Sequence, residues 1–163
     1  MFHGLVVFII MKIVISESQY KKLVEDKEEP KILRIPSLKL FSNDWLLLQK
    51  FLEGRGNPPY SIGGDLVLFQ TTIKSLGNLQ SVGGSLDLRE TPIKSLENLV
   101  SVGRDLDLNL SSIRKLSDLK YVGGDIDLSS TPLGEFLKEQ LPHEVLKEFR
   151  KYIDVQGNVF YRS

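Results

Sequence analysis

Six aspartates are the residues of this chain with the clearest potential for chemistry. They are Asp65, Asp105 and Asp125 at one position of a repeating pattern and Asp87, Asp107 and Asp127 two positions further on. Carboxylates at a fixed spacing can offer oxygen ligands to a hard cation or attract a basic protein surface. A calcium site needs about six to eight oxygens wrapped around the ion, and a flat face supplies few. The pattern therefore favours a basic protein partner over a metal.

The aspartates recur because the chain itself repeats. Four units contain Ile62-Gly63-Gly64, Val82-Gly83-Gly84, Val102-Gly103-Arg104 and Val122-Gly123-Gly124, spaced by twenty residues. Such a period is the signature of a solenoid, whose units bury their apolar faces only by stacking on neighbours. Six positions of each unit are apolar, and in the third unit they are Val102, Leu106, Leu108, Ile113, Leu116 and Leu119. The alternation predicts one short strand per unit, and the later spacing predicts a returning turn or 3₁₀ segment.

The outward positions of the predicted strands form a candidate partner-binding surface. Its residues are Asp65, Val67, Phe69, Asp87, Arg89, Asp105, Asp107, Asn109, Asp125, Asp127 and Ser129, with Ser85 completing the first row. Neighbouring like charges repel, so we expect some of the carboxylate pKa values to be raised. The alternative is that Asp is a polar residue copied by duplication without any use.

The pattern Leu106-x-Leu108-x-x-Ser111-x-Ile113-x-x-Leu116 resembles the leucine-rich repeat, LxxLxLxxNxLxxL. Gly103 stands where that family has its first Leu. The Asn position is filled by a hydroxyl residue in every unit, namely Thr71, Thr91, Ser111 and Thr131. The resemblance implies bonds from this position to backbone groups between coils, which hydroxyls can make more weakly. More narrowly, the unit is similar to the GGDLDLSxTPIKSL-type repeats of small proteins encoded by tailed bacteriophages, most clearly over residues 56–133, a group for which we know no activity.

The predicted fold class is an α/β repeat solenoid, a short leucine-rich-repeat-like parallel β coil with helical N- and C-terminal caps. Residues 1–10 are an apolar leader or a start artefact, with Met11 as a second possible start, and residues 11–60 form the N-terminal cap. Residues 61–132 hold the four repeats, and residues 133–163 form a helical cap with a last strand. The apolar run at the start is shorter than the roughly 20 residues that span a bilayer.

Local signals define the elements of the two caps. Ser16 and Gln19 predict a helix over 17–24, and the weak alternation over 33–40 predicts a strand that Pro36 confines to an edge. Ser42 is expected to cap a helix that carries Trp45 and ends at Gly54. At the other end, residues 135–152 are expected to be helical with an interruption at Pro142, and residues 155–161 to form an altered strand.

Composition narrows the function classes. The 163 residues hold 21 basic and 21 acidic side chains, so bulk charge favours neither nucleic acid nor an anionic membrane. The short basic ladder of Lys74, Lys94 and Arg114 does not change that. The chain has no cysteine, which is consistent with a reducing compartment and predicts a cytoplasmic location, in the host if the gene is viral. With two histidines and no nucleophile motif, we predict no catalytic, cofactor or metal site.

One motif offers an alternative function. Asn57-Pro58-Pro59-Tyr60 resembles the NPPY signature of DNA methyltransferases that modify amino groups, in which the Tyr stacks on a flipped base. The glycine-rich cofactor loop of those enzymes is missing, so a helix stop with Tyr60 over the core edge explains the four residues as well. We therefore predict a non-enzymatic protein-interaction module, encoded by a phage and binding or inhibiting a host protein. The alternative is a nucleic-acid-directed enzyme.

Overall fold

The computed structural model describes residues 18, 31–139, 147 and 149–161. The chain divides into two compact units, Met1–Lys31 and Ile32–Ser163, and all described strands belong to the second. The predicted leader at 1–10 lies outside the described residues. So does the predicted helix at 17–24, except for Ser18, which is helical.

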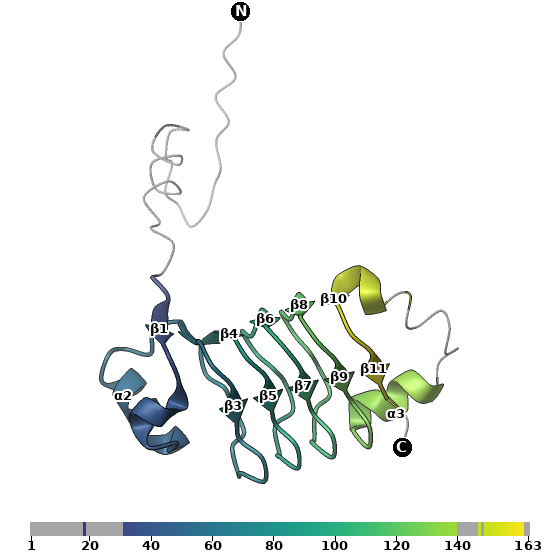
Figure 1. The fold of residues 1–163 in the computed structure, drawn as a ribbon, viewed down its shortest axis with the longest axis horizontal. Coiled ribbons are helices and arrows are strands. Elements are labelled where there is room, and N and C mark those ends of the chain that lie inside the picture. Colours follow the sequence, from purple (N-terminus) through teal and green to yellow (C-terminus); the bar gives the residue numbers. More distant parts are fainter. Residues whose placement is uncertain (1–17, 19–30, 140–146, 148, 162–163) are drawn as a thin grey trace, which may run out of the picture. The chain divides into compact units, whose positions relative to one another are not determined.

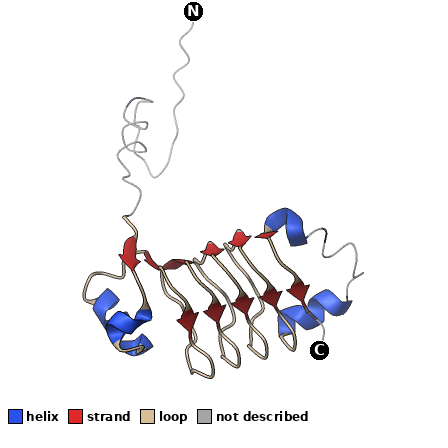
Figure 2. Cartoon of the chain, in the orientation of Figure 1, coloured by secondary structure: helices blue, strands red, loops and turns tan. Residues whose placement is uncertain are grey.

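Two parallel sheets form the second unit (Figures 1 and 2). The six-stranded sheet has the order β1 (Leu33–Ile35), β2 (Tyr60–Ile62), β4 (Leu79–Val82), β6 (Ser101–Val102), β8 (Tyr121–Val122) and β10 (Asp154–Val155). The five-stranded sheet has the order β11 (Val159–Phe160), β9 (Ile126–Asp127), β7 (Leu106–Asp107), β5 (Leu86–Asp87) and β3 (Leu66–Val67). This repeat arrangement, with few helices, is consistent with a solenoid.

Each twenty-residue unit supplies one strand to each sheet, where the sequence predicts only one strand in all. The predicted strand lies in the five-stranded sheet, and its Leu106 pairs with Leu86 on one side and Ile126 on the other. The additional strand, such as Ser101–Val102, is only two to four residues long and therefore too short to show an alternating pattern. Between coils the chain returns through turns and segments outside helices and strands, so of the two predicted alternatives the turn is found in the described residues and the 3₁₀ segment is not.

The core follows the predicted apolar positions. In the third unit Val102, Leu106, Leu108 and Ile113 are 0 % exposed, Leu119 is 3 % exposed and Leu116 is 8 % exposed, which confirms all six. Because equivalent positions pair in register, these side chains stack from coil to coil into one continuous core.

The first glycine of the second, third and fourth units is required by the close approach of successive coils. A Cβ at Gly83 would overlap the carbonyl oxygen of Gly63, and one at Gly103 would overlap that of Gly83. Gly83 N–H also donates to Ile62 O at 2.7 Å, so the backbones cannot move apart without losing a hydrogen bond. The glycine is therefore explained by packing.

The N-terminal end of the solenoid carries η1 (Leu38–Phe41) and α2 (Trp45–Glu53), which lie on the β1 side in Figure 1. The predicted strand is confirmed only over β1, an edge strand, because Ser37 Oγ accepts from Lys39 N at 3.0 Å and starts the 3₁₀ turn. The predicted cap Ser42 is wrong, since Asp44 caps α2 through Leu46 N at 2.8 Å and Leu47 N at 3.1 Å. Gly54 ends the helix as predicted.

At the C-terminal end, α3 (Pro132–Glu139) begins three residues before the predicted Glu135. Its start is fixed by Thr131, whose Oγ1 accepts from Gly134 N at 2.9 Å. Residues 140–146 and 148 of the predicted helix lie outside the described residues, and residues 149–152 are helical. The prediction of one altered strand over residues 155–161 is correct only in part. This stretch holds the end of β10, where Val155 pairs with Val122, and β11, where Phe160 pairs with Asp127, and the two strands belong to different sheets.

The helices within the described ranges give no candidate for a membrane span, since none is long and apolar enough to cross a bilayer.

Candidate functional site

The outward side chains of the five-stranded sheet, called here the outer face, bring all the predicted partner-binding residues together in three rows. The corner row, where the chain enters each strand, comprises Asp65, Ser85, Asp105, Asp125 and Asn158. The outer row, on the strands themselves, comprises Val67, Asp87, Asp107, Asp127 and Phe160. The end row, where the chain leaves the strands, comprises Phe69, Arg89, Asn109 and Ser129, of which Ser129 is buried and so does not belong to the exposed surface that was predicted. The strands that carry them lie side by side in Figure 1.

Two members of these rows, Asn158 and Phe160, were missed by sequence reasoning. They belong to the altered strand β11, in which Phe160 takes the place of an outer-row aspartate beside Asp127. The similarity of residues 155–161 to the repeat was the signal that could have identified them.

The corner-row aspartates join one coil to the next. Asp65 Oδ1 accepts from Ser85 N at 2.8 Å, and Asp105 Oδ1 accepts from Asp125 N at 2.9 Å. In the last coil, Asp125 Oδ1 accepts from Asn158 N at 2.6 Å. One oxygen of each carboxylate is thus committed to a backbone N–H of the following coil, which gives this row a structural task.

The same bonds explain why Arg104 replaces glycine in the third unit. A Cβ at Gly84 would overlap Asp65 Oδ1, and a Cβ at Gly124 would overlap Asp105 Oδ1. The coil before Arg104 carries Ser85 instead of an aspartate, so no carboxylate occupies that space. A side chain at the second glycine position is therefore accommodated where the preceding corner residue is Ser.

The outer-row aspartates make local bonds instead. Oδ1 of Asp87 accepts from Arg89 N at 3.1 Å, and Oδ1 of Asp107 accepts from Asn109 N at 3.1 Å. Asp127 Oδ1 accepts from its own i+2 residue at 2.8 Å. Each of these bonds from the N–H of residue i+2 engages Oδ1 of the aspartate and leaves Oδ2 for other partners.

Arg89 neutralises part of the outer row. Its Nη2 lies 2.6 Å from Asp87 Oδ2 and its Nε lies 3.3 Å from Asp107 Oδ2, so one guanidinium bridges two coils. The guanidinium carbon also lies 4.8 Å from the centroid of the Phe69 ring. Hydrogen bonding and charge from Asp87 raise the pKa of Arg89, which keeps it cationic.

Asp107 is the carboxylate of the outer row most affected by its surroundings. Partial burial raises its pKa, whereas the bond from Asn109 N and the charge of Arg89 act in the opposite direction. Repulsion from Asp127 and Asp87 adds a smaller upward contribution. The expected upward shift is confirmed for this residue, but desolvation rather than repulsion is its largest cause.

Apolar side chains stand at both ends of the aspartate row. Val67 is 63 % exposed and Phe69 38 % exposed at the β3 end, and Phe160 is 46 % exposed at the β11 end. The outer face thus combines exposed apolar groups with an acidic centre.

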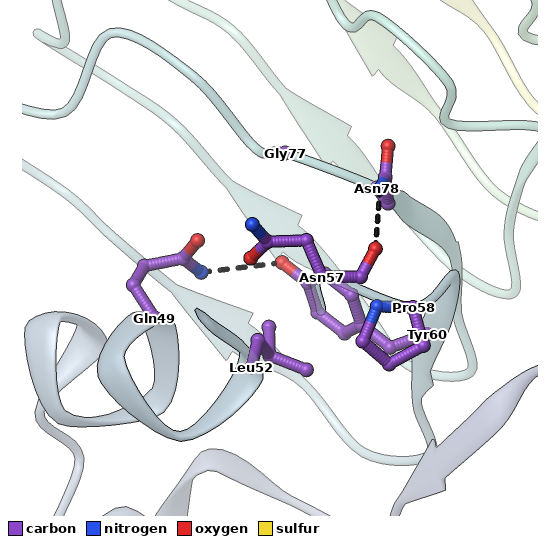
Figure 3. Close-up of a pocket in the computed structure, with 7 residues that line it drawn as sticks. All are labelled: Gln49, Leu52, Asn57, Pro58, Tyr60, Gly77 and Asn78. Atoms are coloured by element: carbon purple, nitrogen blue, oxygen red, sulfur yellow. Dashed lines mark hydrogen bonds between the residues drawn. The ribbon is translucent and has the colours of Figure 1, made fainter. Parts of the chain in front are cut away.

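The NPPY residues lie at a separate place, a pocket of about 250 Å³ next to α2 (Figure 3). Tyr60 is only 1 % exposed, and its hydroxyl donates to Leu76 O at 2.8 Å and accepts from Gln49 Nε2 at 3.5 Å. Burial raises the pKa of this phenol. Asn57 has a φ of 53° after α2, and its carbonyl accepts from Asn78 Nδ2 at 2.7 Å. Tyr60 therefore has no ring face open for stacking.

The hydroxyl residues at the Asn position of the repeat do not link coils, contrary to expectation. Oγ1 of Thr71, Thr91 and Thr131 donates to the carbonyl three residues earlier in the same coil, at 2.7, 2.7 and 2.6 Å. Ser111 Oγ is buried and has no hydrogen-bond partner in the described part of the chain. The link between coils is made elsewhere, where Asn98 Nδ2 donates to Asn78 Oδ1 and to Gly77 O, both at 3.2 Å.

Metal and nucleic-acid chemistry find little support in the described geometry. Within the described ranges, no three His, Cys, Asp or Glu residues are grouped so as to hold a metal ion. Lys74, Lys94 and Arg114 are exposed on the returning segments, at a different place from the outer face.

No family model matches the chain, and no curated protein or solved structure is significantly similar to it.

Proposed function

We propose that this protein is a non-enzymatic interaction module of the leucine-rich-repeat type that binds a protein partner through the outer face. The observation that carries the proposal is the exposure of Val67, Phe69 and Phe160 around the outer-row aspartates. Exposed apolar groups beside charged ones are the composition of recognition surfaces. The net acidity of the row favours a partner with a basic surface. The sequence similarity to bacteriophage repeat proteins favours a bacterial host protein, whose activity the module would inhibit by binding.

The rest of the repeat supports this choice because its positions already have structural tasks. The leucines fill the core, the first glycines allow coils to approach, and the corner aspartates hold backbone N–H groups of the next coil. Residues of the outer and end rows vary between coils without changing the backbone register. Such variation on a constant scaffold is how repeat proteins acquire specificity.

The methyltransferase alternative gains no support from the geometry of its motif. Tyr60 is packed against the core with its hydroxyl bonded to Leu76 O, and Asn57 N donates to Leu52 O in the last turn of α2. A methyl-transfer assay with labelled donor and DNA checks this directly. Robust transfer that Asn57→Ala abolishes would replace our proposal with the enzymatic one.

An affinity capture from bacterial lysate tests the proposed function. Immobilised wild-type chain is compared with Val67→Glu and Asp127→Arg, which change an exposed and a half-buried outer-row position toward opposite ends of the row. The matched control is Lys94→Glu, an exposed change on a returning segment. Circular dichroism melts confirm that each variant is folded.

We expect a protein retained by wild type and by Lys94→Glu to be lost from both outer-row variants. A partner that is captured equally by all four chains would rule out the outer face as the binding surface.

A further inference from the structure

The outer face contains its own example of how it binds a cation. Between the second and third coils, the Arg89 guanidinium donates from Nε to Asp87 Oδ1 at 2.9 Å and from Nη2 to Asp87 Oδ2 at 2.6 Å, and its Nε also lies 3.3 Å from Asp107 Oδ2. The ring of Phe69 supports the same group, with 4.8 Å between the guanidinium carbon and the ring centroid. A planar guanidinium fits this place because its fork bonds one carboxylate, its Nε lies near a second, and its face lies on an aromatic ring.

The next pair of coils repeats the carboxylates without the cation. Asp107 and Asp127 are register partners on β7 and β9, just as Asp87 and Asp107 are on β5 and β7. Strands in a sheet lie about 4.8 Å apart, so the two pairs have closely similar spacing. The position equivalent to Arg89 is Asn109, whose Nδ2 donates to Ser129 O at 3.2 Å. Among the described residues, Asp127 has no ion-pair partner.

An exposed aromatic ring is also present at this end. Phe160 pairs in register with Asp127 on the adjacent strand β11 and is 46 % exposed. Phe160 belongs to the outer row and Phe69 to the end row. The Phe160 ring would therefore flank a cation between Asp107 and Asp127 from a different side than the Phe69 ring flanks Arg89. The junction between the second and third coils and the junction between the third and fourth coils nevertheless both combine two carboxylates with one aromatic group.

We propose that the space between Asp107 and Asp127 is a guanidinium-binding site, which an arginine of the protein partner fills. The proposal rests on the proposed function and makes it specific, because it names the side chain that the outer face recognises. Asp107 already contacts a guanidinium on its other side, so the same carboxylate would lie between two arginines, one from each molecule. Lysine is a poorer match, since its point charge cannot form the bidentate contacts.

A titration followed by nuclear magnetic resonance tests this site without a known partner. The probe is N-acetyl-arginine methylamide, and the side-chain carboxyl resonances of Asp107 and Asp127 are observed. Two further compounds serve as controls: the lysine analogue carries the charge without the fork, and the citrulline analogue carries the shape without the charge. The variant Asp127→Asn removes one carboxylate but keeps the oxygen that bonds Ser129 N. The matched variant Asp118→Asn removes an exposed carboxylate on a returning segment.

We expect the arginine probe to shift both resonances saturably, the lysine analogue to bind at least about fivefold more weakly, and the citrulline analogue to give no saturable shift. Asp127→Asn should weaken arginine binding at least about fivefold, and Asp118→Asn should leave it unchanged. Equal responses to arginine and citrulline, or no effect of Asp127→Asn, would overturn the proposal.

The result is separable from the test of the proposed function. Suppose that the arginine probe does not shift the carboxyl resonances but that capture of a partner still depends on Asp127. This result would refute the guanidinium site and leave the outer face as the binding surface. Suppose instead that the arginine probe binds saturably but that the outer-row variants capture the partner as well as wild type does. This result would support the site and refute the proposed function.

Discussion

The junction between the second and third coils and the junction between the third and fourth coils have the same backbone register but different polar groups. At the earlier junction the corner residue is Ser85, the second glycine position of the next coil holds Arg104, and Arg89 bridges two outer-row carboxylates. At the later junction the corner residue is Asp105, the second glycine position of the next coil holds Gly124, and the outer row has no bridging cation within the described residues.

This difference teaches that coil stacking and surface chemistry are set by separate positions. The buried leucines and the first glycines are constant at both junctions. The corner residue of one coil and the residue at the second glycine position of the next coil change together. An aspartate at the corner occupies the space that a side chain in the next coil would need. The outer-row and end-row residues can change singly, since all but the buried Ser129 are exposed or half-buried. Specificity can therefore vary without loss of the fold.

The largest expected effect is at the glycine of the later junction. A Cβ at Gly124 would overlap Asp105 Oδ1, so Gly124→Ala should lower the free energy of unfolding by roughly 2–3 kcal/mol. Arg104→Ala, at the equivalent place of the earlier junction, should change it by less than about 0.5 kcal/mol. Urea unfolding of both variants measures the difference.

A double variant sharpens the same contrast. Asp105→Ser with Gly124→Arg transfers the Ser85–Arg104 pair to the later junction and removes the carboxylate that obstructs a side chain. We expect the double variant to be more stable than Gly124→Arg alone, by about 1 kcal/mol or more. Strictly additive effects of the two substitutions would refute the proposed steric link between these positions.

The next effect concerns the buried hydroxyls near the two junctions. Thr91 Oγ1 donates to Leu88 O at 2.7 Å, whereas the equivalent Ser111 Oγ has no partner among the described residues. Thr91→Ala should therefore cost about 1–2 kcal/mol of unfolding free energy, and Ser111→Ala should be neutral or stabilising. Thermal unfolding of the two variants compares them. An equal loss would mean that Ser111 also forms a bond in solution.

The smallest of these stability effects is that of the Arg89 bridge. Arg89 is part-exposed and its ion pairs are screened by solvent, so Arg89→Met should lower the free energy of unfolding only slightly at pH 7. The pKa of Asp107 is raised above its ordinary 3.8, so ionisation of this group opposes folding. Its contribution to stability is fully present below pH 3.8 and is lost as the pH rises through the folded pKa.

Removing Arg89 takes away a cation that lowers the pKa of Asp107. The variant's deficit should thus be greatest at neutral pH and shrink as the carboxylates become protonated in acid. Unfolding curves from pH 7 to pH 3 measure this. A deficit that stayed constant over this range would show that Arg89 stabilises the fold through packing and not through its charge.

Much of the fold could be predicted from the sequence because a fixed period constrains every coil at once. The six apolar positions, the outward rows and the altered last strand follow from that period alone. The six-stranded sheet could not be predicted from the period, because a strand of two residues such as Ser101–Val102 leaves no alternating signal. The start of α2 was misplaced because Ser42 and Asp44 are both good caps, and only the 3₁₀ turn before them decides between the two.

The candidate site was less predictable because its chemistry depends on contacts between coils. The sequence places Asp87 and Arg89 near each other, but the bridge from Arg89 to Asp107 requires the register of β5 and β7. The pairing of Ser85 with Arg104 is the exception. Its signal is in the sequence, since glycine is replaced only after the one unit that lacks the corner aspartate.

The most direct test of the central claim is the carboxyl pKa of Asp107 in the variant Asn109→Arg, measured by nuclear magnetic resonance titration. This substitution gives the later junction the arginine of the earlier one. If the space between Asp107 and Asp127 accepts a guanidinium, the pKa of Asp107 falls relative to the wild-type protein, because a second cation then faces it. An unchanged or higher pKa in a folded Asn109→Arg variant would contradict the equivalence of the two junctions.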